Sequence, residues 1–209
     1  MLDFSGLTGL SKFEIHDVEL MGGVYASIIM LAQEGQRFVL QDSVLNRPKD
    51  KGITSIYRGC QDLAVLNCEF ISPEMSLASQ DRTSIVLNVN ANDCKIRNNR
   101  SVRFGTTAVM SGTGHMFVGN HFFQGDDTTS GVRRAGIVLT EPNCKTFITG
   151  NYIDNCTIEM TNEHDSNPDL GSEYTFGGLT ITGNTFTVQD VAPGFRWIVI
   201  KPFGINHSL

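Results

Sequence analysis

The sequence predicts an all-β fold, a right-handed, single-stranded parallel β-helix in which the chain forms a solenoid of about seven coils. Two observations predict this fold. A short motif recurs along the chain, and one position of the motif always holds a residue that tolerates a left-handed backbone. The composition agrees, because Gly is plentiful at 21 residues and charged residues make up only 18% of the chain. Such a mixture favours strands and turns over helices.

The recurring motif is clearest at 116–122, 147–153 and 180–186, which read MFVGNHF, FITGNYI and TITGNTF. The second residue of each copy is an apolar anchor. Successive anchors are 25, 25, 31, 21, 31 and 33 residues apart: Ile15, Leu40, Val65, Ile96, Phe117, Ile148 and Ile181. The shorter intervals fit one coil of a β-helix, and the longer ones require inserted loops.

The position two residues after each anchor predicts a sharp corner. It holds only Gly, Asn or Asp: Asp17, Asp42, Asn67, Asn98, Gly119, Gly150 and Gly183. These residue types accept a positive φ angle more readily than others do. The position five residues after the anchor is apolar in six of the seven copies: Leu20, Leu45, Phe70, Ser101, Phe122, Ile153 and Phe186. In one continuous strand, side chains five positions apart point to opposite faces. For both to point inward, a corner must lie between them.

Two further features complete each coil. A second strand is expected downstream of the corner, at 26–31, 53–57, 84–89, 107–110, 136–140 and 197–200. Four Asn residues share the position three after the anchor: Asn99, Asn120, Asn151 and Asn184. When coils stack in register, these amides can form a ladder of hydrogen bonds, so we expect them to be structural.

Charge and composition exclude several classes of function. The formal net charge of −6 argues against a nucleic-acid partner, which normally requires a basic surface. No apolar run is long enough to span a membrane, and no signal peptide is visible in this segment. The five cysteines show no metal-ligand spacing and no disulfide framework, so reduced thiols and no metal site are expected.

The whole chain, 1–209, is expected to form a single β-helix domain that is open at one or both ends. The first anchors lie close to Met1, and the last segment stops where another anchor would be due. Neither end shows an amphipathic capping helix, which a solenoid end requires. We therefore expect a segment of a longer solenoid, whose missing coils come from a longer parent chain or a neighbouring subunit.

The Gly-Asn corners, the coil length and the Asn ladder resemble the pectate-lyase-like superfamily of right-handed β-helices. That superfamily includes polysaccharide lyases, polygalacturonase-type glycoside hydrolases, epimerases, and spikes and tail fibres of phages and gene-transfer-agent-like particles. The missing signal peptide and caps look more like the phage-derived branch. The resemblance implies a module of a phage-like spike or tail fibre that binds host cell-surface polysaccharide. It would lie on a particle or extracellular surface, with other particle proteins, as a homotrimer or part of a larger assembly.

The alternative function is a polysaccharide-cleaving enzyme, a glycoside hydrolase or lyase. Asp126 and Asp127 are adjacent carboxylates in an insertion and could act as general acid and base, with Glu141 facing them across a groove. Arg133 and Arg134 could clamp an acidic sugar. Gly125-Asp126-Asp127 also resembles the double-aspartate motif of polygalacturonase-type hydrolases, although no Gly-His-Gly or Arg-x-Lys follows. A solvated turn explains the same residues.

A second insertion brings together Glu163, His164 and Asp165. These side chains could contact substrate, perform acid–base chemistry or hold a hard cation such as Ca²⁺. A plain polar loop is the alternative, and no other cofactor is expected. A third possibility for the whole chain is a structural stalk without a ligand.

Overall fold

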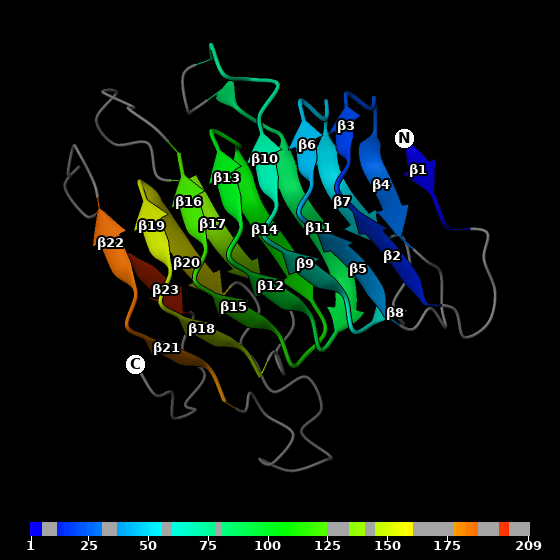
Figure 1. Ribbon diagram of the computed structural model, residues 1–209. Helices are drawn as coiled ribbons and strands as arrows, with labels where there is room; N and C mark the ends of the chain where they lie inside the picture. Colours follow the sequence, from blue (N-terminus) through cyan, green and yellow to red (C-terminus); the bar gives the residue numbers. More distant parts are fainter. Residues whose placement is uncertain are drawn as a thin grey trace.

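The computed structural model (Figure 1) describes residues 1–5, 12–30, 37–55, 60–77, 81–124, 134–140, 145–160, 178–187 and 197–200. These residues form an all-β fold of three parallel sheets and contain no α-helix. The arrangement is consistent with the predicted parallel β-helix.

The three sheets are named A, B and C. Sheet A contains, in spatial order, β1 (Leu2–Asp3), β4 (Ala26–Met30), β7 (Lys51–Ser55), β11 (Ile85–Asn92), β14 (Thr106–Ser111), β17 (Arg134–Leu139), β20 (Cys156–Met160) and β23 (Ile198–Ile200), while β8 (Cys60–Gln61) also pairs with β11. Sheet B contains β2 (Phe13–His16), β5 (Phe38–Gln41), β9 (Ala64–Leu66), β12 (Lys95–Arg97), β15 (Met116–Val118), β18 (Phe147–Thr149) and β21 (Thr180–Thr182). Sheet C contains β3 (Glu19–Met21), β6 (Val44–Asn46), β10 (Glu69–Ile71), β13 (Arg100–Val102), β16 (His121–Phe123), β19 (Tyr152–Asp154) and β22 (Thr185–Thr187).

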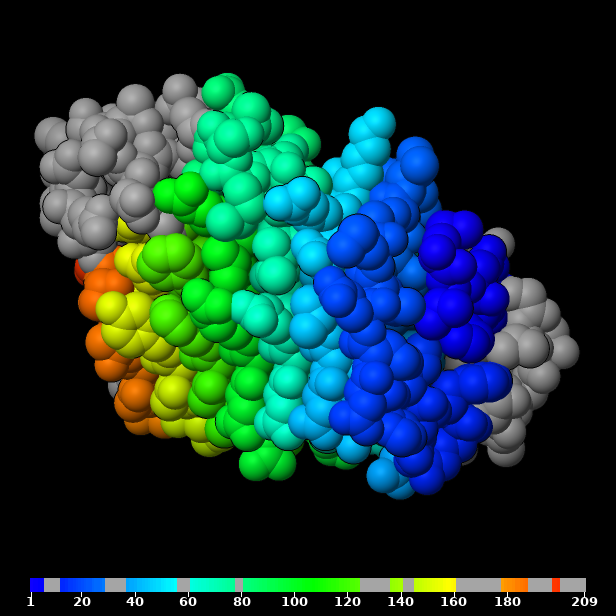
Figure 2. Space-filling model, turned by 45° about the horizontal axis from the view of Figure 1, so that its top comes forward, coloured from blue at the N-terminus to red at the C-terminus, as the bar shows by residue number. Residues whose placement is uncertain are grey.

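The chain contributes one strand to sheet B, one to sheet C and one to sheet A in turn, and we call each such set of strands a repeat. Repeats 1 to 7 begin with the strands that carry the seven anchors. Each anchor pairs with the anchors of the neighbouring repeats, as Ile96 does with Val65 and Phe117. Successive repeats lie side by side as bands in Figure 2, in the order of the sequence. The predicted alignment of the repeats is therefore confirmed.

The corner between sheets B and C has the predicted left-handed residue in every repeat. The φ angles at this position are 55° and 48° at Asp17 and Asp42, 54° and 55° at Asn67 and Asn98, and 68°, 64° and 63° at Gly119, Gly150 and Gly183. The positive φ turns the chain sharply and allows the inward side chains to change parity between the two strands.

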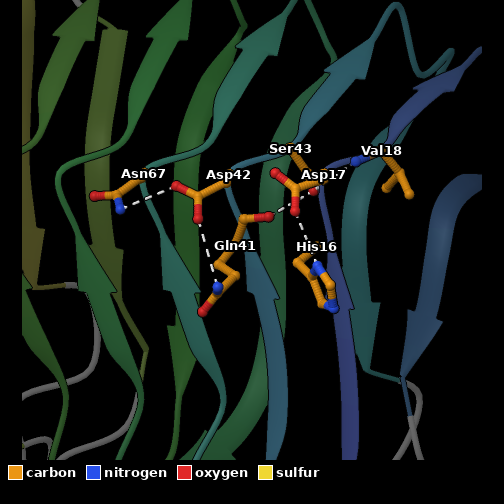
Figure 3. Close-up of polar contacts among 7 residues, drawn as sticks. All are labelled: His16, Asp17, Val18, Gln41, Asp42, Ser43 and Asn67. Atoms are coloured by element: carbon orange, nitrogen blue, oxygen red, sulfur yellow. Dashed lines mark hydrogen bonds and ion pairs between the residues drawn. The ribbon is translucent and has the colours of Figure 1, made fainter.

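In the first repeats, side chains at this corner bond to one another (Figure 3). Asn67 Nδ2 donates to Asp42 Oδ1 across 3.1 Å, so the corner residues of two repeats are joined. The Ser43 hydroxyl donates to Gln41 O at 2.6 Å and accepts the Val18 N–H at 3.3 Å. Polar side chains thus satisfy backbone groups that the corner leaves without a strand partner.

The Asn ladder forms as predicted in the later repeats. Asn99, Asn120 and Asn151 each donate from Nδ2 to Oδ1 of the Asn in the following repeat, at 2.9–3.1 Å. The same Oδ1 atoms accept backbone N–H groups, and each Nδ2 of Asn99, Asn120, Asn151 and Asn184 also donates to an anchor carbonyl of the preceding repeat. The three amides Asn99, Asn120 and Asn151 are buried, so this network replaces their contacts with water.

The core is a single cluster of buried side chains enclosed by the three sheets. Anchors and the residues five positions later supply much of it, including Leu40, Leu45, Phe117 and Phe122. The side chains of Cys68, Cys94 and Cys156 are buried, and none of these three cysteines forms a disulfide.

Two features of the fold differ from the sequence-based expectation. The sequence places the second insertion at 157–170, but β20 occupies its first residues, because Cys156, Ile158 and Met160 alternate into the core. A second column of positive φ angles lies three residues before the anchor, at Arg37, Asp62, Asp93, Gly114 and Gly178. This corner leads into sheet B. Its residue types are too mixed to form a visible pattern.

Candidate functional site

Most of the predicted site residues lie outside the described residues. They are Asp126, Asp127, Arg133, Glu141, Glu163, His164 and Asp165. Arg134 begins β17, and only its backbone is described. The structure therefore does not test whether these side chains meet.

The described strands show where these segments attach to the fold. Segment 125–133 precedes β17, segment 141–144 follows it closely, and segment 161–177 follows β20. β17 and β20 are neighbours in sheet A. Asp126 and Glu141 therefore belong to segments that are joined to opposite ends of β17. A strand of six residues spans ~20 Å, so the two points of attachment are far apart. A shared catalytic centre would require both segments to extend over the outer face of sheet A.

Along β11 and β14 the outer face of sheet A is lined by neutral groups, most of them polar. In β11, Leu87, Val89 and Ala91 are buried in the core cluster. Side chains alternate along a strand, so Asn88, Asn90 and Asn92 lie on the opposite face, where they are half-buried. One strand thus presents three amides, each able to donate and accept hydrogen bonds.

Neighbouring strands continue this polar face. Asn90 pairs in register with Ser111, whose hydroxyl lies 2.6 Å from the Thr140 hydroxyl. Asn88 pairs with Val109, which is followed in the next strand by Val138. The face therefore combines amides and hydroxyls with a small apolar area, a mixture that suits an uncharged polar ligand.

The amides of this face differ in their availability. Asn92 Oδ1 accepts the Thr113 backbone N–H at 3.1 Å, and Asn90 Oδ1 is buried without a hydrogen-bond partner among the described residues. The Asn88 amide forms no hydrogen bond with any residue that the structure describes. Asn88 is therefore the amide of β11 that is most available to a ligand.

Glu159 contributes a carboxylate to the same face, since Val138 pairs with it in register. The Thr157 hydroxyl donates to Glu159 Oε1 at 2.8 Å. This hydrogen bond orients the carboxylate beside the amides and hydroxyls. A carboxylate at this place can accept two hydrogen bonds from adjacent sugar hydroxyls.

A third insertion, which the sequence did not single out, leads into β11, an inner strand of sheet A. It is the connection between β10 and β11, residues 72–84. Arg82 Nη1 donates to Gln124 O at 2.7 Å, and Arg103 Nη1 donates to Met75 O at 2.9 Å. Gln124 is the last described residue before segment 125–133, so this insertion is tied to the base of the segment that carries Asp126. The 31-residue interval between Val65 and Ile96 was the available signal.

Glu74 holds the two ends of this insertion together. Its carboxylate accepts the backbone N–H and the hydroxyl of both Thr83 and Ser84, at 2.5–3.1 Å. Burial raises the pKa of Glu74, but the hydrogen bonds from Ser84 and Thr83 outweigh it, so the pKa lies below its ordinary value. The insertion is therefore fastened by an ionised carboxylate at neutral pH.

The described residues contain neither a metal site nor a membrane-spanning helix. No group of three or more His, Cys, Asp or Glu side chains among them could hold a metal ion. Within the same residues, no helix is long and apolar enough to cross a membrane. The predicted Ca²⁺ ligands Glu163 and Asp165 lie outside this part of the chain.

Comparison with known proteins adds no family. No family model, no curated protein and no solved structure matches this chain.

Proposed function

We propose that this chain is a right-handed parallel β-helix module that binds polysaccharide through the outer face of sheet A. The observation that carries the proposal is the row of amides and hydroxyls at Asn88, Asn90, Asn92, Ser111 and Thr140. Sugars present hydroxyl groups that donate and accept, and neutral amides and hydroxyls match them without burying a charge. Val109 and Val138 offer apolar contact to the C–H groups of a sugar ring.

The repeat architecture supports an extended ligand. Stacked repeats place equivalent side chains ~4.8 Å apart along the sheet, so a linear polymer can contact several repeats at once. The insertions 72–84, 125–133 and 161–177 all connect to sheet A and can border such a ligand. Inserted loops on one face are where repeat proteins commonly carry function.

The biological setting follows from the resemblance to phage-derived β-helices. In this proposal the module belongs to a spike or tail fibre of a phage-like particle and binds a host cell-surface polysaccharide. Its partners are other particle proteins, in a homotrimer or a larger assembly at the particle or extracellular surface. The alternative, polysaccharide cleavage by Asp126, Asp127 and Glu141, remains a prediction.

A glycan array followed by calorimetry tests the binding site. The variant Asn88→Leu removes the free amide while keeping a side chain of similar size, and we expect roughly tenfold weaker binding of the best glycan. Asn46→Leu is the matched control, because Asn46 lies on sheet C and bonds to Glu19 at 2.9 Å. Equal affinity of the wild type and Asn88→Leu would contradict the proposed site, and absence of any glycan binding would contradict the function.

A reducing-sugar assay separates binding from cleavage. Turnover of a bound polysaccharide by the wild type would favour the enzymatic alternative. Turnover that persists in Asp126→Asn and Asp127→Asn would exclude these two carboxylates as the acid and base.

A further inference from the structure

Sheet B carries a hollow on its outer face, away from the polar row of sheet A. The hollow has a volume of about 300 Å³ and lies over β2, β5, β9 and β12, which are consecutive in the sheet (Figure 1). Its volume lies at the lower end of the range found for ligand pockets.

The hollow arises from a pattern of side-chain length across four repeats. Glu14, Val39, Ala64 and Lys95 pair in register across the four strands. Two short side chains lie between two long ones, so the middle strands form a floor and the outer strands form walls. The walls stand three strand spacings apart, ~14 Å, and Leu66 adds to the apolar floor.

Opposite charges line the walls, and some already have partners. Glu14 lies 2.7 Å from Lys12, and Asp62 lies 3.1 Å from Lys95. Arg37 and Arg97 also line the hollow and are exposed. Among the residues that the structure describes, neither of these guanidinium groups forms an ion pair within 4.0 Å. The hollow therefore offers two available cations above an apolar floor.

Arg37 has a backbone conformation that is unfavourable for a long side chain. Its φ angle is 54°, and the equivalent positions of other repeats are occupied by Asp62, Asp93 and Gly114. A long side chain is uncommon in this conformation, where Gly, Asn and Asp are favoured. Arg103 has a φ of 58° and uses its guanidinium to hold Met75 O. Arg37 thus places a guanidinium at the wall of the hollow from a position that usually takes Gly, Asn or Asp.

We propose that this hollow is a second carbohydrate subsite, which takes a sugar unit carrying an anionic group. The sugar ring lies on Val39, Ala64 and Leu66, and its anionic oxygens accept hydrogen bonds from Arg37 and Arg97. Guanidinium groups suit carboxylate and phosphate oxygens because both bind in a bidentate manner. The inference rests on the proposed function and adds the ligand class, a glycan with acidic units.

Calorimetry on the whole chain tests the subsite with three probes. A hyaluronan hexasaccharide supplies sugar carboxylates, mannose 6-phosphate supplies a sugar phosphate, and maltohexaose is neutral. We expect one of the anionic probes to bind, and the probe that binds identifies the anionic group. The double variant Arg37→Met with Arg97→Met should bind that probe roughly tenfold more weakly, and added salt should weaken wild-type binding.

The matched control is Arg47→Met with Arg100→Met. It removes the same charge, and Arg47 has a φ of 55° like Arg37, but neither residue lines the hollow. We expect this control to keep the wild-type affinity for the anionic probe within about twofold. An equal loss in both double variants would overturn the subsite, because general charge would then explain the binding.

The outcomes separate the subsite from the proposed function. If neutral glycans bind in a manner that depends on Asn88 and neither anionic probe binds, the subsite is wrong and the function stands. If no glycan of any kind binds, the function and the subsite both fail.

Discussion

Repeats 1–3 and repeats 4–7 form the same corner between sheets B and C by different means. In repeats 1–3 the interior column two residues before the anchor is apolar, with Phe13, Phe38 and Leu63. In repeats 5 and 6 the same column holds the polar residues His115 and Thr146, while Cys94 of repeat 4 and Leu179 of repeat 7 belong to the core cluster, and a buried amide ladder runs beside the column. One backbone geometry is thus compatible with an apolar interior and with a polar one, provided that every polar group in the ladder is satisfied.

The largest expected difference between the two regions is the cost of removing a ladder residue. The Asn120 side chain takes part in four hydrogen bonds, so Asn120→Ala should lower the free energy of unfolding by about 4 kcal/mol. Cys68→Ala, at the same position of repeat 3, should lower it by about 1 kcal/mol. Urea denaturation measures both changes, and equal losses would show that the ladder adds no stability beyond ordinary packing.

His115 should make the later repeats sensitive to acid. Burial lowers the pKa of His115 from 6.5 to about 4. The folded protein therefore binds the proton less readily than the unfolded chain does. Stability is complete above about pH 6.5 and falls as the pH drops toward 4, by about 3 kcal/mol for this group.

Unfolding free energies measured between pH 4 and 7 test this expectation. His115→Gln removes the titrating group, so the wild type should lose more stability than the variant over this range. The difference between the two isolates His115 from His121, whose pKa burial also lowers. Parallel pH profiles would contradict the assignment.

The corner glycines of the later repeats should be replaceable by Asn but not by Ala. Gly150 has a φ of 64°, and a Cβ there would meet no atom within 4 Å. Gly150→Ala should therefore report backbone strain alone, about 1 kcal/mol. Gly150→Asn should lose less, because Asn67 and Asn98 adopt the same conformation. Thermal unfolding of both variants distinguishes them. An equal loss of stability would mean that the positive φ angle at this position does not determine the cost of the substitution.

The smallest effect is a gain at the boundary between the two regions. Cys68 already donates its N–H to Asn99 Oδ1 at 2.9 Å, and its thiol contacts Leu40 O at 3.5 Å. Cys68→Asn would extend the ladder by one repeat and should raise the free energy of unfolding by about 1 kcal/mol. A loss of stability would show that repeat 3 lacks the space for an amide.

The sequence predicted the repeat and its first corner because both depend on few residue types. Only Gly, Asn and Asp occupy the corner from Asp17 to Gly183, and every one has a positive φ. The second corner was not predicted because its positions hold different residue types, such as Arg37 and Asp62. A shared backbone conformation without a shared residue type leaves no recurring motif in the sequence. β20 was hidden because a five-residue strand next to a polar segment resembles part of a loop.

The sequence-based site was a set of candidate residues rather than a geometry. Asp126 and Glu141 were chosen for their chemistry, and chemistry alone does not place two side chains together. The polar row of sheet A was missed because Asn88, Asn90 and Asn92 become neighbours of Ser111 and Thr140 only through strand register. Three alternating Asn residues in one strand were a visible sign of a polar outer face.

The constant register of the anchors makes each repeat an exchangeable unit. Ile96 and Phe117 lie 21 residues apart and occupy equivalent places between Val65 and Ile148. Excision of one such period leaves every remaining anchor, corner and amide with a matching neighbour. Gene duplication or deletion can therefore lengthen or shorten this protein in whole steps while the remaining strands keep their register.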